Sequence, residues 1–287
     1  MIDQAEDKLR SDIVEVGRRL HVRGYIASSD GNISVRLDPD RLLTTPAGIS
    51  KGFMDPGVMV VTDMMGKVVA GPRKASSELL MHLEIYRQRP DVNAVVHAHP
   101  PLATGFAVAG IPLDRAVLAE VITTLGSIPI AEYGTPSTQE LADAVRKYIK
   151  AHDGLLLANH GAVTVAPELF AAYFKMETIE HFARISLVAR LLGGERLLSR
   201  EEVTRLQSLR GTYGIAAPAP ICADGPDDRE DATCQVVQAP SSPQARLVAD
   251  VQGRIAGPPG AGMDREIRLT YRELTALIED AVRNLKP

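Results

Sequence analysis

A series of short strand-like runs, separated by helical patterns, places the strongest constraint on the fold of this sequence. Each run has four to six residues, is rich in Val, Ile or Leu, and is bounded by Gly, Pro, Asn or Asp. Such runs bury their apolar side chains when they pair in a sheet that helices cover. The order of the patterns therefore predicts helices packed on a mixed or antiparallel sheet. The runs are residues 33–36, 58–62, 92–97, 155–158 and 162–165.

Apolar residues at helical spacing predict the helices. Leu9, Ile13, Val16 and Leu20 form one apolar stripe, and this helix is expected to end near Gly24. Residues 77–87, 138–150 and 167–192 show the same spacing, and the last helix should stop at the glycine pair 193–194. No repeat of fixed period is visible, which excludes solenoids and propellers.

The length and charge of the chain restrict its class of function. The 287 residues suffice for one large domain with additional material, and the formal net charge is −4. Without a basic excess, a nucleic acid is not an expected partner. The N-terminal region carries Asp3, Glu6 and Asp7 rather than a basic leader, and no apolar stretch reaches the length of a membrane span. We therefore expect a cytoplasmic protein with no membrane partner.

The composition changes near residue 215. Residues 1–215 are expected to form the domain, whereas residues 216–264 are rich in Pro, Gly and Ala and resemble a flexible linker. Residues 265–287 contain an apolar stripe that predicts a C-terminal amphipathic helix. Cys222 and Cys234 lie in the expected linker without metal-ligand spacing, so we expect two reduced, inert thiols.

Three histidines are candidates for metal ligands. His97 and His99 end a strand-like run, and alternate residues of a strand point to the same side, so the two imidazoles would converge. Burial in the core is an equally good interpretation of this pair alone. His160 lies where another buried run enters a glycine turn. Three neutral imidazoles would leave coordination positions open, as in a catalytic zinc site, although Mn²⁺, Co²⁺ or Ni²⁺ would also suit these ligands.

Glu78 and the serines before it have two interpretations. Ser76 or Ser77 could cap the following helix, with Glu78 an ordinary first-turn acid. The same residues could hold a phosphate at the helix N-terminus beside a carboxylate that transfers protons. The small-residue turns 29–34 and 44–48 are likewise either simple turns or anion-binding nests. His82 and His181 each follow a glutamate by four positions, and we interpret both as structural.

Five short motifs, taken in order, resemble the class II aldolase/adducin family, and within it the aldolases that act on fuculose 1-phosphate. The resemblance covers roughly residues 5–215 and implies a three-layer α/β/α fold with a central, mainly antiparallel sheet. It also implies a homotetramer with active sites at subunit interfaces. The motifs are G-N-I-S at Gly31, T-P-x-G at Thr45, S-S-E at Ser76, H-x-H at His97 and N-H-G at Asn159.

The resemblance implies a role for each motif. The metal would be bound by His97, His99 and His160, with Glu78 as a fourth ligand that becomes the acid/base when substrate binds. The implied reaction is reversible cleavage of a ketose 1-phosphate to dihydroxyacetone phosphate and an aldehyde such as lactaldehyde, with the ion stabilising the enediolate. The phosphate would be held by Gly31, Asn32, Gly48, Ser76 and Ser77.

The chain departs from the family pattern at two places. Ala47 stands where these aldolases have a threonine in the phosphate loop, and Thr45 is the candidate to supply the missing hydroxyl. Residues 116–124 lack the tyrosine that protonates the aldehyde oxygen. Tyr133 and Tyr213 are the candidate replacements.

Other activities occur on the scaffold that this resemblance implies. Sugar-acid phosphate decarboxylases, methylthioribulose-phosphate aldolases or dehydratases and pentulose-phosphate 4-epimerases remain alternatives, because a metal-stabilised enolate serves these reactions. The epimerases typically have aspartate after the paired serines, so Glu78 favours an aldolase. The complete set of three histidines argues against a non-enzymatic, adducin-like binding module.

The C-terminal helix has two interpretations. It could pack on its own domain or on a neighbouring subunit, because an exposed apolar stripe is unfavourable. Linker-plus-helix extensions of this kind also resemble the encapsulation peptides of bacterial microcompartment enzymes. That resemblance implies a shell protein as a partner and a location inside a microcompartment.

Overall fold

A computed structural model describes residues 4–213, 215, 219–222 and 233–238. The C-terminal helix expected at residues 265–287, and most of the linker expected before it, lie outside the described residues. None of the described helices is long and apolar enough to cross a membrane.

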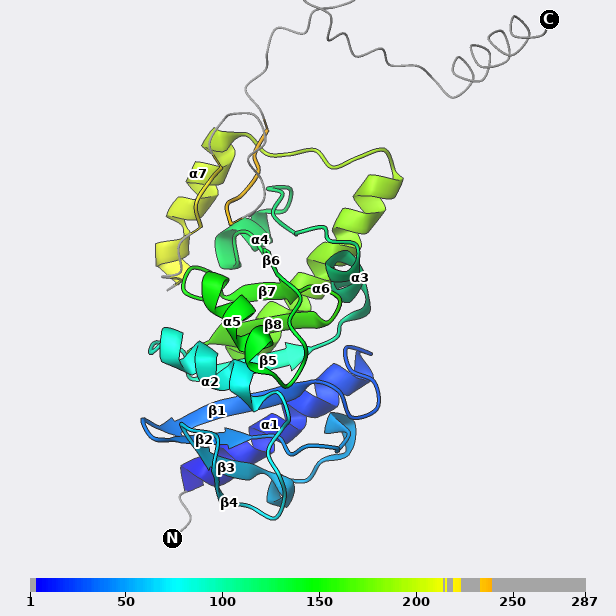
Figure 1. Cartoon of the computed structure of the whole chain (residues 1–287). Coiled ribbons are helices and arrows are strands. Elements are labelled where there is room, and N and C mark those ends of the chain that lie inside the picture. The colour runs from blue at the N-terminus through cyan, green and yellow to red at the C-terminus, as the bar shows by residue number, and fades with distance from the viewer. Residues whose placement is uncertain (1–3, 214, 216–218, 223–232, 239–287) are drawn as a thin grey trace, which may run out of the picture. The chain divides into compact units, whose positions relative to one another are not determined.

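The described strands form a single sheet in the order β4-β3-β2-β1-β5-β8-β7-β6 (Figure 1). All neighbours pair antiparallel except β6 and β7, which are parallel. The prediction of a mainly antiparallel sheet is therefore confirmed. The strands are β1 (Asn32–Asp38), β2 (Arg41–Thr44), β3 (Val60–Asp63), β4 (Val68–Ala70), β5 (Ala94–Ala98), β6 (Ile130–Ala131), β7 (Gly154–Leu157) and β8 (Gly161–Ala166).

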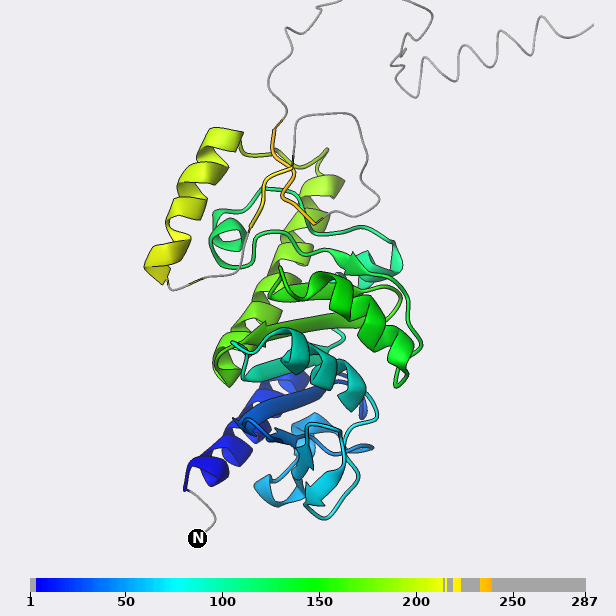
Figure 2. The ribbon, with the colours of Figure 1, turned by 60° about the vertical axis from the view of Figure 1, so that its left-hand side comes forward.

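Helices cover both faces of this sheet, so the expected three layers are present (Figures 1 and 2). One face packs against α1, α3 and α6, and the other against α2 and α5. Alternation along β5 explains the division, because Ala94 and Val96 enter the first core and Val95 enters the second. The α-helices are α1 (Gln4–Val22), α2 (Leu79–Gln88), α3 (Pro101–Val108), α4 (Ala119–Thr124), α5 (Gln139–Tyr148), α6 (Leu169–Leu191) and α7 (Arg200–Ser208), and the 3₁₀ helices are η1 (Lys51–Phe53), η2 (Pro56–Val58) and η3 (Arg210–Tyr213).

Local sequence explains where two of these helices begin and end. The long helix α6 stops before Gly193 and Gly194, whose φ values of 113° and 126° are accessible to glycine, as expected. Helix α7 was not expected from the apolar spacing. It begins with a capping box in which Ser199 and Glu202 satisfy each other's backbone N–H groups.

Residues 219–222 and 233–238, which we call the strap, pack against α4 and α7 although the sequence suggested a linker there. Val237 is buried with Ala116, Ile122 and Val203. In Figure 2 the strap residues in orange lie beside the yellow helix α7.

The strap also corrects the expectation of two free thiols. Cys222 and Cys234 form a disulfide, with Cα atoms 5.0 Å apart. Closing a loop of this length typically contributes about 2–4 kcal/mol to the free energy of unfolding, mainly by restricting the unfolded chain. The covalent link thus complements the small apolar cluster beneath it.

Candidate metal centre

Three histidines converge at one end of the central strands. His97 is fully buried near the end of β5, His99 follows that strand, and His160 lies in the turn between β7 and β8. Their ring centroids are 4.8–5.0 Å apart in all three pairs. One nitrogen from each ring lies within 4.8 Å of the others. The three imidazoles can therefore share one ion.

Glycine 161, at the start of β8, makes this convergence sterically possible. A Cβ atom at this position would lie 2.5 Å from Cδ2 of His99 and 2.6 Å from the carbonyl oxygen of Ala98. The turn before it contains Asn159 with a φ of 54°, a left-handed conformation that asparagine tolerates. The N-H-G motif thus combines a tight turn with a close approach to the neighbouring strand.

Hydrogen bonds fix the orientation of two of the rings. The Nδ1 atom of His97 lies 2.8 Å from the carbonyl oxygen of Ala162, so this nitrogen carries the proton and donates. The Nδ1 atom of His99 lies 3.0 Å from Oδ2 of Asp30. Both rings then direct Nε2 lone pairs at a common point, and these two Nε2 atoms are 3.1 Å apart. Two lone pairs at this distance repel unless a proton or a cation lies between them.

The Glu78 carboxylate completes the cluster. Glu78 precedes α2, and its Oε1 atom lies 3.1 Å from Nε2 of His160 while its Oε2 atom lies 3.3 Å from Nε2 of His97. Oε2 also accepts a hydrogen bond of 2.7 Å from Nδ2 of Asn32. Asn32 is the residue of β1 that pairs with His97 of β5, so sheet register brings the amide and the imidazole to the same carboxylate.

The pKa shifts follow from burial and from charge. Burial would raise the pKa of Glu78, but the charges of His97 and His160 and their hydrogen bonds outweigh it and hold this pKa well below its usual range. Burial would lower the pKa of His97, yet the Glu78 carboxylate outweighs burial and raises it. For His99, burial and then the charges of His97 and His160 lower the pKa to about 3. His99 is therefore a neutral ring with an available lone pair near pH 7.

The donor set fits a divalent cation. Neutral imidazoles with a carboxylate are the ligands of catalytic zinc sites, and similar sets bind other first-row metals. Two buried polar atoms beside the cluster, Nδ1 of His160 and Oδ1 of Asn32, have no hydrogen-bond partner in the described part of the chain. Buried polar atoms without partners are costly, so they mark a place built to receive a further group.

The residues predicted to hold phosphate surround the same end of the sheet. The Ser76 N–H donates to the carbonyl of Thr45, which places the S-S-E segment beside the T-P-x-G turn. Gly31 and Gly48 have φ values of 67° and 70°, so both turns depend on glycine. Ser77 and Gly48 are exposed, and Ser76 is half-buried.

Two of these residues have structural partners. Thr45 is fully buried, and its hydroxyl accepts the N–H of Ile33, so its side chain serves the fold rather than an open surface. The Ser76 hydroxyl accepts the N–H of Glu78 at 3.3 Å, as an N-terminal turn requires. The interpretation of Ser76 or Ser77 as the N-cap is wrong, because α2 begins at Leu79 and Glu78 occupies the N-cap position.

The structure does not bring the two candidate tyrosines to the histidines within one chain. Tyr133 follows β6 and is 60% exposed, and Tyr213 ends η3 and is 65% exposed. Among the described residues, no hydrogen bond or ring contact joins either tyrosine to the cluster. Both side chains lie mostly exposed on the surface of the chain.

His82 and His181 are not among the three histidines that converge. His82 is buried, and its Nδ1 atom lies 2.7 Å from the Ser34 hydroxyl in a small network with Tyr86. His181 lies on an exposed part of α6. Asp30, by contrast, was not expected as a partner of His99. The sequence shows that Asp30 lies in the S-D-G-N turn. Its contact with His99, however, depends on the path of the backbone through that turn.

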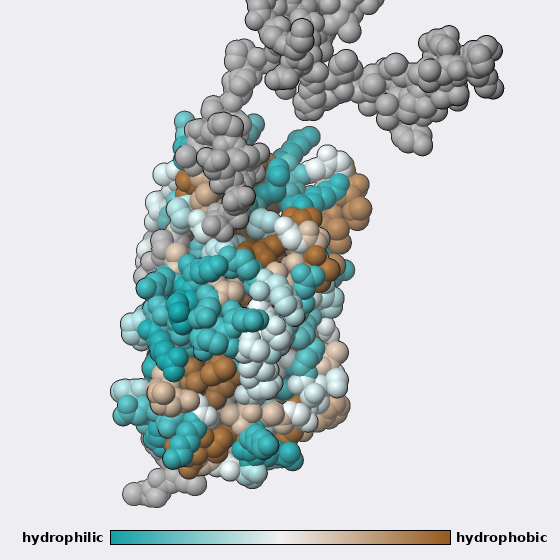
Figure 3. Space-filling view, viewed as in Figure 1, coloured by the Kyte–Doolittle hydropathy of each residue, from teal (hydrophilic) through white to brown (hydrophobic). Residues whose placement is uncertain are grey.

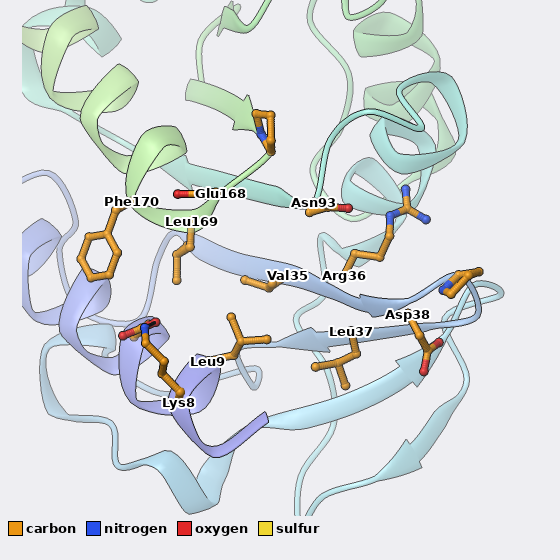
Figure 4. Close-up of a pocket in the computed structure, with 13 residues that line it drawn as sticks. Lys8, Leu9, Val35, Arg36, Leu37, Asp38, Asn93, Glu168, Leu169 and Phe170 are labelled. Carbon is orange, nitrogen blue, oxygen red and sulfur yellow. Dashed lines mark hydrogen bonds and ion pairs between the residues drawn. The ribbon is translucent and has the colours of Figure 1, made fainter. Parts of the chain in front are cut away.

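A cavity of about 620 Å³ lies at the other end of β1 from Asn32 (Figure 4). It is lined by Lys8, Arg36, Asp38 and Phe170 among others. Several of its charged groups already have partners: Lys8 pairs with Asp12 at 2.6 Å, and Asp38 pairs with Arg41 at 2.7 Å. None of the three histidines nor Glu78 lines this cavity, so it is separate from the histidine cluster.

The sequence and the fold of the chain are similar to those of known proteins. Residues 11–187 match the model of the class II aldolase and adducin N-terminal domain. A 5-deoxy-D-ribulose 1-phosphate aldolase of Bacillus thuringiensis serovar kurstaki is 34% identical over 209 residues, covering 72% of this chain and 97% of that protein. A 3-oxo-tetronate 4-phosphate decarboxylase of Pectobacterium atrosepticum is 30% identical over 208 residues, covering 70% and 94%. A solved L-fuculose 1-phosphate aldolase superposes with a TM-score of 0.66 at 33% identity, covering 70% and 95%.

The contact at residue 161 gives a test of the centre. Gly161→Ala should displace the His99 ring, because the new Cβ atom would lie 2.5 Å from it. We expect zinc binding to weaken on the order of 10- to 100-fold, the range found when the support of a ligand is lost. Titration calorimetry of the metal-free protein measures this. Gly105→Ala, in α3 with no atom within 4 Å of the added carbon, is the matched control. Equal zinc affinity in the two variants would contradict the assignment of His99.

Proposed function

Because the chain belongs to the family of class II aldolase and adducin N-terminal domains, we propose that it is a lyase that cleaves a ketose 1-phosphate reversibly. The products would be dihydroxyacetone phosphate and an aldehyde such as lactaldehyde. L-fuculose 1-phosphate and related deoxyketose 1-phosphates are the proposed substrates. Support comes from the relatives named as aldolases of 5-deoxy-D-ribulose 1-phosphate and L-fuculose 1-phosphate.

The observation that carries this proposal is the contact of Glu78 with two of the three histidines. Its carboxylate oxygens lie 3.1 Å and 3.3 Å from Nε2 of His160 and of His97. A carboxylate at this position is close enough to a substrate bound by the same histidines to exchange a proton with it. Asn32 donates a hydrogen bond to Oε2 of Glu78, which leaves Oε1 to exchange the proton.

A divalent cation held by His97, His99 and His160, with Zn²⁺ the first candidate, would polarise the substrate carbonyl as a Lewis acid. Glu78 would remove and return the proton on the carbon of dihydroxyacetone phosphate that joins the aldehyde. Backbone N–H groups of the turns at Gly31 and Gly48, with Ser76 and Ser77, would hold the phosphate and so fix which carbon faces Glu78.

The proton for the aldehyde oxygen would come from a second subunit of a homotetramer. Tyr133 and Tyr213 are both exposed, and among the described residues neither forms a hydrogen bond or ring contact with the cluster of its own chain. Apolar side chains are exposed on α3 and at the end of α6 and form a brown area at the upper right of Figure 3. An apolar area of this kind is typical of a subunit interface. The exposed apolar residues of these two elements include Val108 in α3 and Val188, Leu191 and Leu192 at the end of α6.

A decarboxylase acting on a sugar-acid phosphate is the second candidate. The Pectobacterium relative with that name is 30% identical over 208 residues. The absence of a tyrosine in residues 116–124 also favours a reaction without an aldehyde product. Both reactions pass through an enolate, so the same four side chains would serve either substrate.

We also propose that residues 265–287 dock the enzyme to a microcompartment shell protein. Support comes from their sequence alone, in which Leu274, Ile278 and Leu285 lie at helical spacing after a capping-box pattern at Thr270. This segment lies outside the described residues.

The direct test of the reaction uses zinc-loaded protein, dihydroxyacetone phosphate and a panel of aldehydes, with identification of the products by mass spectrometry and NMR. We expect a ketose 1-phosphate from lactaldehyde. Glu78→Gln should lower turnover by about 10²–10⁴-fold, because an amide cannot carry the proton. Glu201→Gln, on the exposed side of α7, is the matched control. Carbon dioxide release from 3-oxo-tetronate 4-phosphate without aldol product would instead establish the decarboxylase.

Removal of residues 264–287 tests the docking proposal. The shortened protein should keep its turnover and lose co-sedimentation with purified shell protein, because only the helix contacts the partner. Lower turnover or lower thermal stability after the deletion would show that the helix belongs to the enzyme itself.

A further inference from the structure

A buried lysine lies beside the candidate metal centre and has no role in the reaction described above. Lys51 begins η1 and is only 3% exposed. Its Nζ atom donates a hydrogen bond of 2.5 Å to the carbonyl oxygen of Ser29. Within the described part of the chain, no carboxylate lies within ion-pair distance of this ammonium group.

Keeping a cation in this place is unfavourable in itself. Burial lowers the pKa of Lys51, and the charges of Asp30 and Glu78 only partly oppose that effect. Helix α1 also makes room for the lysine. A Cβ atom at Gly17 would lie 2.6 Å from the Lys51 carbonyl oxygen and 3.1 Å from its Cβ atom. A costly buried charge beside a cluster of ligands is more typical of a site than of a core.

The contact of Lys51 leads directly to a metal ligand. Ser29, whose carbonyl receives the ammonium group, precedes Asp30. One carboxylate oxygen of Asp30 accepts the N–H of Ala27 at 2.6 Å, and the other lies 3.0 Å from Nδ1 of His99. The next residue, Gly31, is equally confined, because a Cβ atom there would lie 2.9 Å from the carbonyl oxygen of His97. The turn of residues 29–31 is therefore held by Lys51 at Ser29 and by close packing against His97 at Gly31.

We propose that Lys51 is a positioning residue of the metal centre. Its ammonium group fixes the Ser29–Asp30 turn and balances the Asp30 carboxylate, so that Asp30 holds His99 with Nε2 toward the ion. This inference rests on the proposed metal-dependent function. A histidine that binds a metal commonly donates its other ring N–H to a carboxylate. Here the carboxylate is that of Asp30, and the charge of Lys51 would support it in turn.

Zinc affinity of the full chain without substrate tests this role, because it does not depend on which reaction the enzyme performs. Lys51→Met should weaken zinc binding on the order of 10- to 100-fold, measured by competition with a chromogenic chelator. Lys51→Arg, which keeps the positive charge and an N–H donor, should restore most of the affinity. Lys67→Met removes an exposed lysine after β3 and should change nothing.

A double-mutant cycle with Asp30→Asn shows whether Lys51 acts through Asp30. If it does, Lys51→Met should add little to the loss caused by Asp30→Asn alone, since the two residues serve one contact. Additive losses would overturn the proposal. If Lys51→Met fails to fold, Lys51→Gln, which also removes the charge, completes the cycle with Asp30→Asn.

Kinetics at saturating zinc separate positioning from direct contact with substrate. A positioning residue predicts a KM within about twofold of the unaltered enzyme once the metal site is filled. Unchanged zinc affinity with a KM raised tenfold or more would show that Lys51 binds the substrate phosphate, and would overturn the proposal. Zinc binding by the unaltered protein without aldol cleavage would contradict the proposed reaction while leaving the role of Lys51 standing.

Discussion

The candidate site depends on one electrostatic constraint, the convergence of imidazole nitrogens and a carboxylate at the end of the central strands. The Nε2 atoms of His97 and His99 are 3.1 Å apart, and the Glu78 carboxylate contacts His97 and His160. Dipoles and charges at these distances are stable only when a cation or shared protons lie among them. The folded chain keeps these groups close together although their repulsion is unfavourable and His97 is completely buried.

The sheet supplies the rigidity that this constraint needs. β5 lies between β1 and β8, so the pairing of Asn32 with His97 and of His97 with Val163 fixes the central imidazole from both sides. The other parts of the site come from turns at the same end of the sheet, where backbone groups are free to meet a ligand. Catalytic groups held by strand ends and glycine turns can be positioned closely without filling the space between them.

Much of this arrangement could be predicted from local sequence. The apolar runs and helical stripes predicted helices on a mixed or antiparallel sheet, and the family resemblance implied the three layers. Strand periodicity predicted that His97 and His99 converge. The position of His160 before a glycine turn was a weaker signal, because it required the β7–β8 hairpin to pair with β5 through β8. Helices α3, α4 and α7 were missed, because α3 and α4 have only eight and six residues and α7 depends on its capping box.

Other features could not be predicted, because they depend on the path of the backbone through loops. The contact of Asp30 with His99 and the contact of Lys51 with Ser29 join segments that no periodicity relates. The disulfide between Cys222 and Cys234 could not be predicted either. The twelve-residue separation of Cys222 and Cys234 is compatible with a linker, and only the 5.0 Å between their Cα atoms shows that they pair.

We propose that three imidazoles and one carboxylate of this chain hold a single catalytic metal ion. X-ray absorption spectroscopy of the zinc-loaded full chain tests it most directly, because the method counts imidazole ligands and measures their distances. We expect three imidazole nitrogens at about 2.0–2.1 Å from the ion and additional oxygen at a similar distance. Fewer than three imidazoles, or sulfur in the first coordination sphere, would contradict it.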